Sequence, residues 1–266
     1  MRIHVVAIAS VSVRGSCDDL ALPVHAYGSH ADQFAELTLP ANGDQPYPVA
    51  VVLHGGFWRQ RYGLDQMREL CADLVTRGWA AYNVEYRRVG GDGGYPQTLQ
   101  DVAAAIDALA EIDAPLDLDR VVTIGHSAGG QLALWAAAAR KRRPHRVSLA
   151  GAVGQAAVSD LERAAQLDLG AGIVEEFCGG SPEQAPAAYR AASPAVQLPF
   201  GVPQLLVHGQ RDDTVPAAMS AHYADVARAG GDDVTLVLRE RDGHFEHIDP
   251  RSAAWEAVID WLRRFS

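Results

Sequence analysis

A serine enclosed by glycines is the part of this sequence whose chemistry is easiest to define. Ser127 stands between Gly125 and Gly129, and Gly-x-Ser-x-Gly is typical of a nucleophile on a sharp turn between a strand and a helix. Residues 120–124 are largely β-branched and predict that strand, whereas residues 131–139 are rich in alanine and predict that helix. Such a turn is strained, and glycines on either side remove side chains that would collide with its neighbours. We therefore predict that Ser127 is a nucleophile.

Two further polar residues follow short apolar runs in the second half of the chain. Asp212 comes after the run at residues 204–207, and His244 comes after the run at residues 234–238. Open α/β sheets place their chemistry just past the carboxyl ends of the strands. Because a serine hydroxyl needs a base before it can attack a carbonyl carbon, we predict His244 as that base. Asp212 would hold the imidazole in the right tautomer and stabilise its charged form.

The tetrahedral intermediate of such an attack needs hydrogen-bond donors for its oxyanion, and the backbone offers them in two places. One is the N–H group of Ala128, directly after the nucleophile. The others are the N–H groups of Gly56 and Phe57, in a segment that follows the apolar run at residues 49–53. We predict that these three residues form an oxyanion hole.

Several neighbours of these residues receive secondary roles. We assign substrate binding to Trp58 and His126, although for His126 the alternative is that it simply fits the turn. His54 and His208 precede glycines at strand ends, and we expect them to hold their loops by hydrogen bonds rather than to transfer protons. Asp213, beside the predicted triad acid, is expected to face the loop exterior or to cap the helix that follows.

The elements that would position these residues alternate between strands and helices. This alternation predicts an α/β fold with a mostly parallel sheet and helices on both faces, with an antiparallel start at residues 35–39. We predict a single domain over residues 1–266, with a small helical cap inserted at about residues 155–203. Residues 3–13 are expected to form an edge strand or an extension, with a signal segment as the alternative. The predicted strands lie at residues 49–53, 80–86, 120–124, 147–153, 204–207 and 234–238, and the predicted helices at 64–77, 97–112, 131–139, 216–228 and the C-terminal end.

From Leu39 to the C-terminus the sequence resembles the α/β-hydrolases of the esterase and lipase group, in which serine, acid and histidine follow this order. The His-Gly-Gly-Phe-Trp segment and Glu85-Tyr86-Arg87-Arg88 bring it near small bacterial carboxylesterases and kynurenine formamidase-like enzymes. The hormone-sensitive-lipase group typically has a third glycine where this chain has Phe57. The resemblance implies a serine hydrolase that cleaves small carboxylic esters through an acyl-enzyme. The alternatives are an arylformamidase acting on N-formylkynurenine, another amidase or peptidase, or a catalytically silent binding protein.

Composition limits the partners and the compartment. The chain has 266 residues and a net charge of −10, which disfavours nucleic acid or an anionic membrane as a partner. Three cysteines do not suggest a disulfide framework, so a reducing, cytoplasmic location is expected. No metal-binding motif and no stretch long enough for a membrane span is evident in the sequence. We therefore expect a cytoplasmic enzyme without metal or other cofactor that acts on a small-molecule ester or amide; a homodimer is left open.

Overall fold

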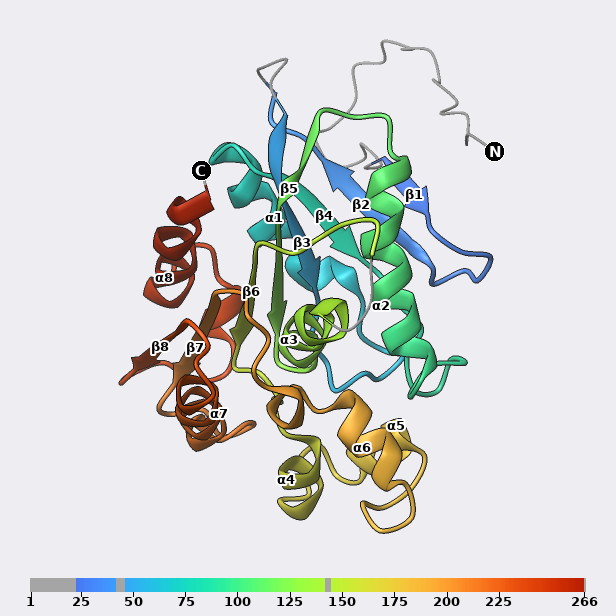
Figure 1. The fold of residues 1–266 in the computed structure, drawn as a ribbon, viewed down its shortest axis with the longest axis vertical. Helices are drawn as coiled ribbons and strands as arrows, with labels where there is room; N and C mark the ends of the chain where they lie inside the picture. The colour runs from blue at the N-terminus through green and yellow to red at the C-terminus, as the bar shows by residue number, and fades with distance from the viewer. Residues whose placement is uncertain (1–22, 42–45, 142–144, 266) are drawn as a thin grey trace.

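The computed structural model describes residues 23–41, 46–141 and 145–265, and within them eight strands form one sheet (Figure 1). The strands lie across the sheet in the order β1-β2-β4-β3-β5-β6-β7-β8. β2 pairs antiparallel with both β1 and β4, and all other neighbours pair parallel. The predicted mostly parallel sheet with an antiparallel start is confirmed. The strands are β1 (Val24–Ala26), β2 (Phe34–Thr38), β3 (Tyr47–Leu53), β4 (Ala80–Val84), β5 (Leu116–His126), β6 (Gly151–Gln155), β7 (Gln204–Gly209) and β8 (Val234–Arg239).

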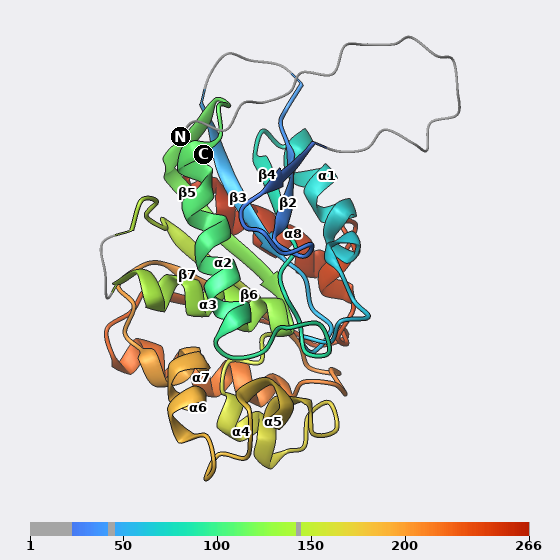
Figure 2. The ribbon, with the colours of Figure 1, turned by 90° about the vertical axis from the view of Figure 1, so that its right-hand side faces the viewer.

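Alternate residues of β3 show how two layers of helices cover the sheet. Val49, Val51 and Leu53 belong to one apolar cluster, whereas Ala50 and Val52 belong to another, because successive side chains of a strand point to opposite faces. The first cluster includes residues of α2, α3 and α7, and the second includes residues of α1 and α8, which Figure 2 shows on the two sides of the sheet. These helices are α1 (Arg68–Thr76), α2 (Gln97–Ala108), α3 (Ala128–Lys141), α7 (Ala217–Ala229) and α8 (Ala253–Leu262), with single 3-10 turns at Leu64–Met67, Leu109–Glu111, Pro194–Gln197, Glu246–Ile248 and Arg263–Phe265.

The carboxyl ends of the parallel strands place the predicted chemistry at one edge of the sheet. Leu53 of β3 lies opposite Gly125 of β5, so the segments that follow these two strands start side by side. Gly209 of β7 lies opposite Arg239 of β8, which does the same for the segments that carry the predicted acid and base. All of these segments leave the sheet in the same direction, as expected for an open α/β sheet.

Three short helices occupy the interval between β6 and β7, where the sequence predicts a cap. They are α4 (Leu161–Gln166), α5 (Ile173–Cys178) and α6 (Pro186–Ala192). They lie together at the lower end of the molecule in both ribbon views (Figures 1 and 2). Their buried side chains, among them Phe177 and Tyr189, belong to the same apolar cluster as those of α3. The three helices are therefore packed onto the rest of the fold through apolar contacts.

The structure moves some predicted boundaries. β5 starts at Leu116 instead of residue 120, because its first residues pair with Tyr47 and Pro48 ahead of a shift in register. β6 starts at Gly151 instead of residue 147. The segment at residues 3–13, predicted as an edge strand or an extension, lies outside the described residues. None of the described helices has both the length and the apolar composition that a membrane span requires.

Candidate active site

Ser127 lies on the turn between β5 and α3, and its backbone has the strained shape that the glycine pattern predicts. Its φ is 56°, in the left-handed region that L-residues rarely adopt. A Cβ atom on Gly125 would lie 2.0 Å from the carbonyl oxygen of Gly129, and one on Gly129 would lie 2.1 Å from that of Leu53. Only glycine fits either position. A hydrogen bond from the Ser127 N–H to the carbonyl of Gln155, at 2.8 Å, holds the turn.

His244 and Asp212 form a hydrogen-bonded pair after β8 and β7. The Nδ1 of His244 lies 2.7 Å from Oδ2 of Asp212, and Oδ1 of Asp212 accepts from the N–H groups of Thr214 and Val215 at 2.9 and 2.8 Å. Burial by itself raises the pKa of Asp212, but hydrogen bonds from His208 and His244 outweigh it and hold that pKa well below its ordinary value. Because an ionised carboxylate can only accept, the His244 ring carries its hydrogen on Nδ1.

Asp213 takes no part in this pair. Its side chain is exposed, and Oδ1 accepts only a long hydrogen bond, 3.3 Å, from the Thr214 hydroxyl. Helix α7 begins at Ala217, after Pro216, and no side chain of the described residues caps it by a hydrogen bond. The prediction that Asp213 faces the loop exterior is confirmed. The alternative that it caps α7 is wrong, because the free N–H groups of this loop bond to Asp212 instead.

The predicted oxyanion donors lie on the other side of Ser127. The segment after β3 passes directly against the turn, so that a Cβ atom on Gly55 would lie 3.2 Å from the Cβ of Ser127. The N–H groups of Gly56, Phe57 and Ala128 donate no hydrogen bond to any described residue. They are therefore available to an oxyanion, and their assignment as an oxyanion hole stays a prediction.

Comparison with known proteins gives this arrangement a family. The model of the BD-FAE family matches residues 35–226, which is more than half of the chain. The chain belongs to the BD-FAE family. The matched range includes Ser127 and Asp212 and ends before His244.

Two curated proteins that are similar to this BD-FAE chain are named as esterases. The chain is 27% identical over 220 residues to Esterase LipC of Mycobacterium tuberculosis, with 76% of this chain and 52% of the relative covered. It is 29% identical over 196 residues to Esterase LipQ of the same organism, with 69% and 46% covered. The chain therefore spans about half the length of the curated relatives it matches.

Solved structures share the fold of this BD-FAE chain. A bifunctional GH43-CE protein of Bacteroides eggerthii has a TM-score of 0.81 at 19% identity, covering 91% of this chain and 37% of that one. Esterase B from Lactobacillus rhamnosis has a TM-score of 0.77 at 23% identity, with 93% and 88% covered. Est2, a thermophilic esterase from Thermogutta terrifontis, has a TM-score of 0.73 at 22% identity, with 92% of each chain covered. The α/β-hydrolase fold that the sequence predicts is confirmed.

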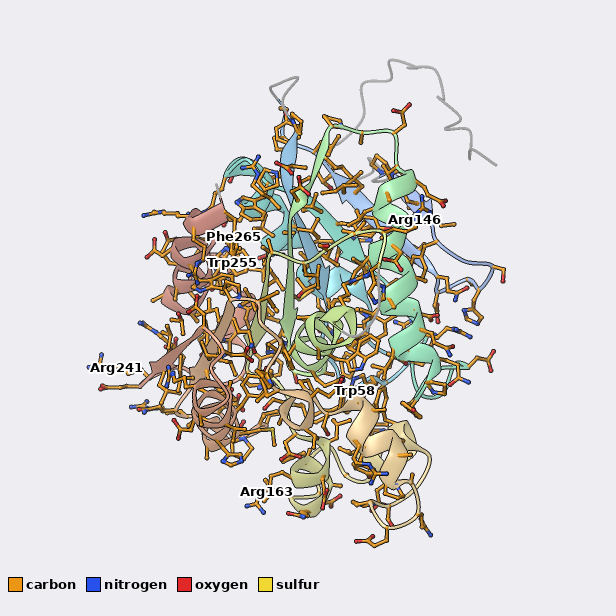
Figure 3. The ribbon with its side chains drawn as sticks, viewed as in Figure 1. Trp58, Arg146, Arg163, Arg241, Trp255 and Phe265 are labelled. Atoms are coloured by element: carbon orange, nitrogen blue, oxygen red, sulfur yellow. The ribbon has the colours of Figure 1, made fainter. Side chains whose placement is uncertain are left out.

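Trp58 of the BD-FAE chain is a buried anchor. Its side chain has no exposed surface, its Nε1 donates to Oε1 of Gln131 at 3.0 Å, and its ring stacks on Phe177 with centroids 4.5 Å apart. Figure 3 labels it where the sheet meets the helices of the interval between β6 and β7. We therefore revise its predicted contact with substrate: the backbone at Trp58 is left-handed, with φ 53°, and its ring lies in the core.

Three further histidine rings lie near His244: the His126 ring is next to those of His244 and His247, and the His247 ring is next to that of His208. Nε2 of His126 lies 2.8 Å from the carbonyl oxygen of His244, and burial lowers the pKa of His126 well below its ordinary value. Burial also lowers the pKa of His247, to about 3. His126 is almost wholly buried, a placement that favours the alternative that it fits the turn. Among the described residues, no group of three or more His, Cys, Asp or Glu side chains is placed to hold a metal ion.

A buried network ahead of the oxyanion donors is a feature that the sequence reasoning missed. Nε2 of His54 lies 2.9 Å from Oε1 of Glu85, and the His54 ring stacks on Tyr86 with centroids 4.3 Å apart. His208, near the end of β7, plays a similar part for the loop that follows, because its Nε2 lies 2.8 Å from the carbonyl oxygen of Val215. The prediction that both histidines hold their loops is confirmed. The partners of His54 are distant in sequence, and only the resemblance drew attention to Glu85 and Tyr86.

The sequence reasoning also passed over the exposed phenylalanine that follows the predicted base. The Phe245 side chain is 66% exposed, and its ring stands edge-on to the His244 ring with centroids 5.2 Å apart. It is the neighbour along the chain of the group that would hand a proton to a leaving group. Phe245 therefore presents an exposed apolar ring beside His244.

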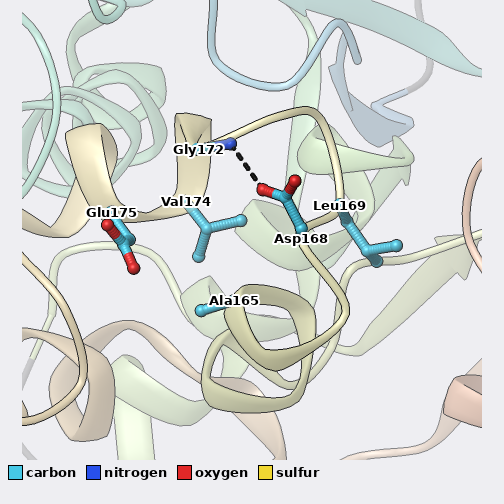
Figure 4. A pocket seen from close by; sticks show the side chains of 6 residues that line it. All are labelled: Ala165, Asp168, Leu169, Gly172, Val174 and Glu175. Atoms are coloured by element: carbon cyan, nitrogen blue, oxygen red, sulfur yellow. Dashed lines mark hydrogen bonds between the residues drawn. The ribbon is translucent and has the colours of Figure 1, made fainter.

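A small cavity lies within the helices between β6 and β7 (Figure 4). Its volume is about 90 Å³, and its wall includes no residue of the predicted triad. The Asp168 carboxylate beside it is already used, because Oδ1 accepts from the N–H of Gly172 at 2.9 Å. We therefore do not place the reacting part of a substrate there. The cavity is lined by Ala165, Asp168, Leu169, Gly172, Val174 and Glu175.

Proposed function

We propose that the protein is a carboxylesterase that cleaves small, soluble esters with Ser127 as its nucleophile. The observation that carries the proposal is the His244–Asp212 pair, at 2.7 Å, on the same sheet edge as a serine in a strained, glycine-flanked turn. Membership of the BD-FAE family and similarity to two proteins named as esterases support ester hydrolysis.

In the first half of the proposed reaction, Ser127 becomes acylated. His244 takes the proton of the Ser127 hydroxyl while Oγ attacks the ester carbonyl carbon. The oxyanion that develops is met by the predicted backbone donors, and Asp212 stabilises the imidazolium. The ester C–O bond then breaks, and His244 gives its proton to the departing alcohol. Ser127 Oγ has no hydrogen-bond partner among the described residues, and catalytic hydrogen bonds often tighten only when substrate binds.

In the second half, water replaces the alcohol. His244 takes a proton from the water, whose oxygen attacks the acyl carbon, and Ser127 leaves with that proton as the free acid is released. Short acyl groups are the proposed substrates, because the structurally similar Est2 is described with butyrate and with propionate bound. The exposed ring of Phe245 would contact the departing alcohol.

The test of the proposal is the hydrolysis of p-nitrophenyl acetate by the wild-type chain and by Ser127→Ala. We expect the variant to keep its fold, measured by circular dichroism, and to lose roughly 10⁴- to 10⁶-fold in kcat. A purified variant that retains more than about a tenth of the wild-type rate would rule out Ser127 as the nucleophile, since residual catalysis without a triad member is orders of magnitude lower.

A substrate panel then separates the proposed activity from the alternatives. It contains p-nitrophenyl esters of increasing chain length, a long-chain triglyceride emulsion and N-formylkynurenine. We expect the highest kcat/KM with short acyl esters. A clear preference for N-formylkynurenine would assign an arylformamidase instead, and a preference for the emulsion would contradict a small, soluble substrate.

We further propose that the protein acts in the cytoplasm on a small molecule, without nucleic acid or a membrane as partner. The net charge of −10 disfavours nucleic acid and anionic membranes as partners, and a sparse, odd set of three cysteines supports a reducing, cytoplasmic location. The purified chain should therefore not co-sediment with vesicles of anionic lipid, and it should not shift the gel mobility of a duplex DNA. Binding of either at physiological salt would contradict this proposal.

A further inference from the structure

The predicted oxyanion donors come from two separate parts of the chain, so other contacts must fix the position of one part relative to the other. Gly56 and Phe57 follow β3, whereas Ala128 is the first residue of α3. An oxyanion hole works only when its donors already point at the place where charge develops. The question of what fixes the first segment relative to the second rests on the proposed function, because it concerns the same reaction.

The backbone of the first segment is strained. Gly56, Phe57 and Trp58 have φ values of 98°, 52° and 53° in succession. Phe57 and Trp58 carry side chains, and L-residues in this region persist only where the surrounding structure holds them there. A backbone of this kind relaxes once its anchor is removed, and the N–H groups it carries move with it.

Trp58 is the anchor, and its partner stands on the helix of the nucleophile. The indole Nε1 donates to Oε1 of Gln131 at 3.0 Å, and both side chains are fully buried. Gln131 lies one turn into α3, and its own N–H donates to the carbonyl of Ser127 at 3.1 Å. One hydrogen bond between side chains therefore connects the segment of Phe57 directly to the turn of Ser127.

The same glutamine also reaches the helices between β6 and β7. Its Nε2 donates to the carbonyl of Ala192 in α6 at 2.8 Å. Trp58 meets α5 through its stack on Phe177. Each polar atom of the Gln131 amide thus has a partner, which fixes the orientation of that amide and with it the position of the indole.

We propose that Trp58 and Gln131 are positioning residues: they fix the N–H donors after β3 relative to the N–H donor at the start of α3 in the predicted oxyanion hole. Neither touches the reacting atoms. Trp58 fixes the left-handed backbone at Phe57, and Gln131 fixes Trp58 relative to the helix that starts with Ala128. Their loss therefore affects the transition state more than the binding of the substrate.

The test compares Trp58→Phe with Trp135→Phe, measured on p-nitrophenyl acetate with the full chain. Trp135 is a matched control, because its Nε1 donates to the carbonyl of Ala191 at 2.9 Å, again from α3 to α6. We expect Trp58→Phe to lower kcat by about 10- to 100-fold, less than the 10²- to 10³-fold loss for removing a donor outright, with KM nearly unchanged. Trp135→Phe should leave both kcat and KM within about twofold of wild type.

A second readout reports on the oxyanion hole itself. A trifluoromethyl ketone reacts with the serine hydroxyl to give a tetrahedral oxyanion. In Trp58→Phe its inhibition constant should therefore rise by the same factor by which kcat falls. If that variant does not fold, Gln131→Met, which is similar in length and lacks the amide, takes its place with the same expectation. When both fold, the double variant should lose no more than the worse single variant, because the two residues act as one unit.

An unchanged kcat in Trp58→Phe, or in Gln131→Met where only that variant folds, would overturn the proposal. Equal losses in Trp58→Phe and Trp135→Phe would do the same, because they would show a general loosening of α6 rather than a displaced donor. Failure of the proposed function has a different signature: the wild-type chain hydrolyses no ester, or hydrolysis survives Ser127→Ala. That result would remove the inference together with the function.

Discussion

Compared with the Asp212–His244 side of Ser127, the oxyanion side is built from different parts of the chain. On the first side, side chains meet through hydrogen bonds, with Nδ1 of His244 2.7 Å from Oδ2 of Asp212. On the second side, the predicted donors are backbone N–H groups, and residues 56–58 have successive positive φ values of 98°, 52° and 53°. The function of the first side depends on which functional groups are present. The function of the second depends on backbone shape, and hence on the buried residues that maintain it.

The largest effect that tests this comparison is the exchange of one carboxylate oxygen for nitrogen at Asp212. Asp212→Asn should lower kcat by about 10⁴-fold, because His244 loses its tautomer and its imidazolium loses its counter-charge. Asp213→Asn is the matched control: its side chain is exposed, so kcat and the melting temperature should both stay close to wild type. Steady-state kinetics and thermal melts of the two variants provide the measurement. A severe defect in Asp213→Asn with a mild one in Asp212→Asn would reverse the assignment.

Gly56→Ala should displace the predicted oxyanion donors without changing any side chain of the predicted triad. The φ of Gly56 is 98°, and a Cβ there would lie 2.5 Å from the Tyr62 side chain. We expect Gly56→Ala to lower kcat by roughly 10- to 100-fold, because the neighbouring donors shift. Gly78→Ala is the control: φ is 88° and, among the described residues other than its chain neighbours, no atom lies within 4 Å of the new Cβ, so it should cost about 1 kcal/mol of stability with normal kcat. If both variants lose stability and neither loses kcat, the oxyanion assignment fails.

A further test concerns pH and the Asp212–His244 side of Ser127. A base must be neutral to accept a proton, so kcat/KM should fall as the pH drops. Burial lowers the pKa of His126 well below its ordinary value and that of His247 to about 3, so protonation of these two rings would not cause a fall at mildly acidic pH. The pKa of Asp212 is also held low, so this carboxylate stays ionised. We therefore expect kcat/KM to fall as the pH drops, by up to tenfold per pH unit; a profile that stays flat to pH 4.5 in the folded protein would argue against a histidine base.

The residues on the Asp212–His244 side of Ser127 could be predicted from the sequence, because a local pattern marks each of them. Ser127, Asp212 and His244 each follow an apolar run, and the parallel sheet brings the ends of those runs together. The helices and strands could be predicted for the same reason, although β6 begins four residues later than expected because the strand starts only where it pairs with its neighbours. The sequence also offered Asp213 as a cap of the following helix, and this was wrong because the N–H groups of Thr214 and Val215 donate to Asp212 instead.

On the oxyanion side of Ser127, the sequence predicts the glycines and the backbone donors beside them, but not the buried residues that support this backbone. Trp58 looks like a contact residue in the sequence because it is aromatic and follows the predicted donors, yet a left-handed backbone turns it into the core. Its partner Gln131 is 73 residues away, and His54 and Glu85 are 31 residues apart. Pairs of this kind depend on how the sheet brings distant segments together, and no local pattern of residues encodes them.

The most direct test of Ser127 as the nucleophile is covalent labelling with a fluorophosphonate probe. The wild-type chain is treated with the probe, digested and mapped by mass spectrometry, while ester hydrolysis is followed in parallel. An activated serine displaces fluoride and becomes phosphonylated, and this requires the base and the oxyanion donors on its two sides. We predict one adduct, on Ser127, that forms at the rate at which hydrolysis is lost. Hydrolysis that continues in a fully labelled chain, or an adduct on another residue that accounts for the loss, would contradict the account.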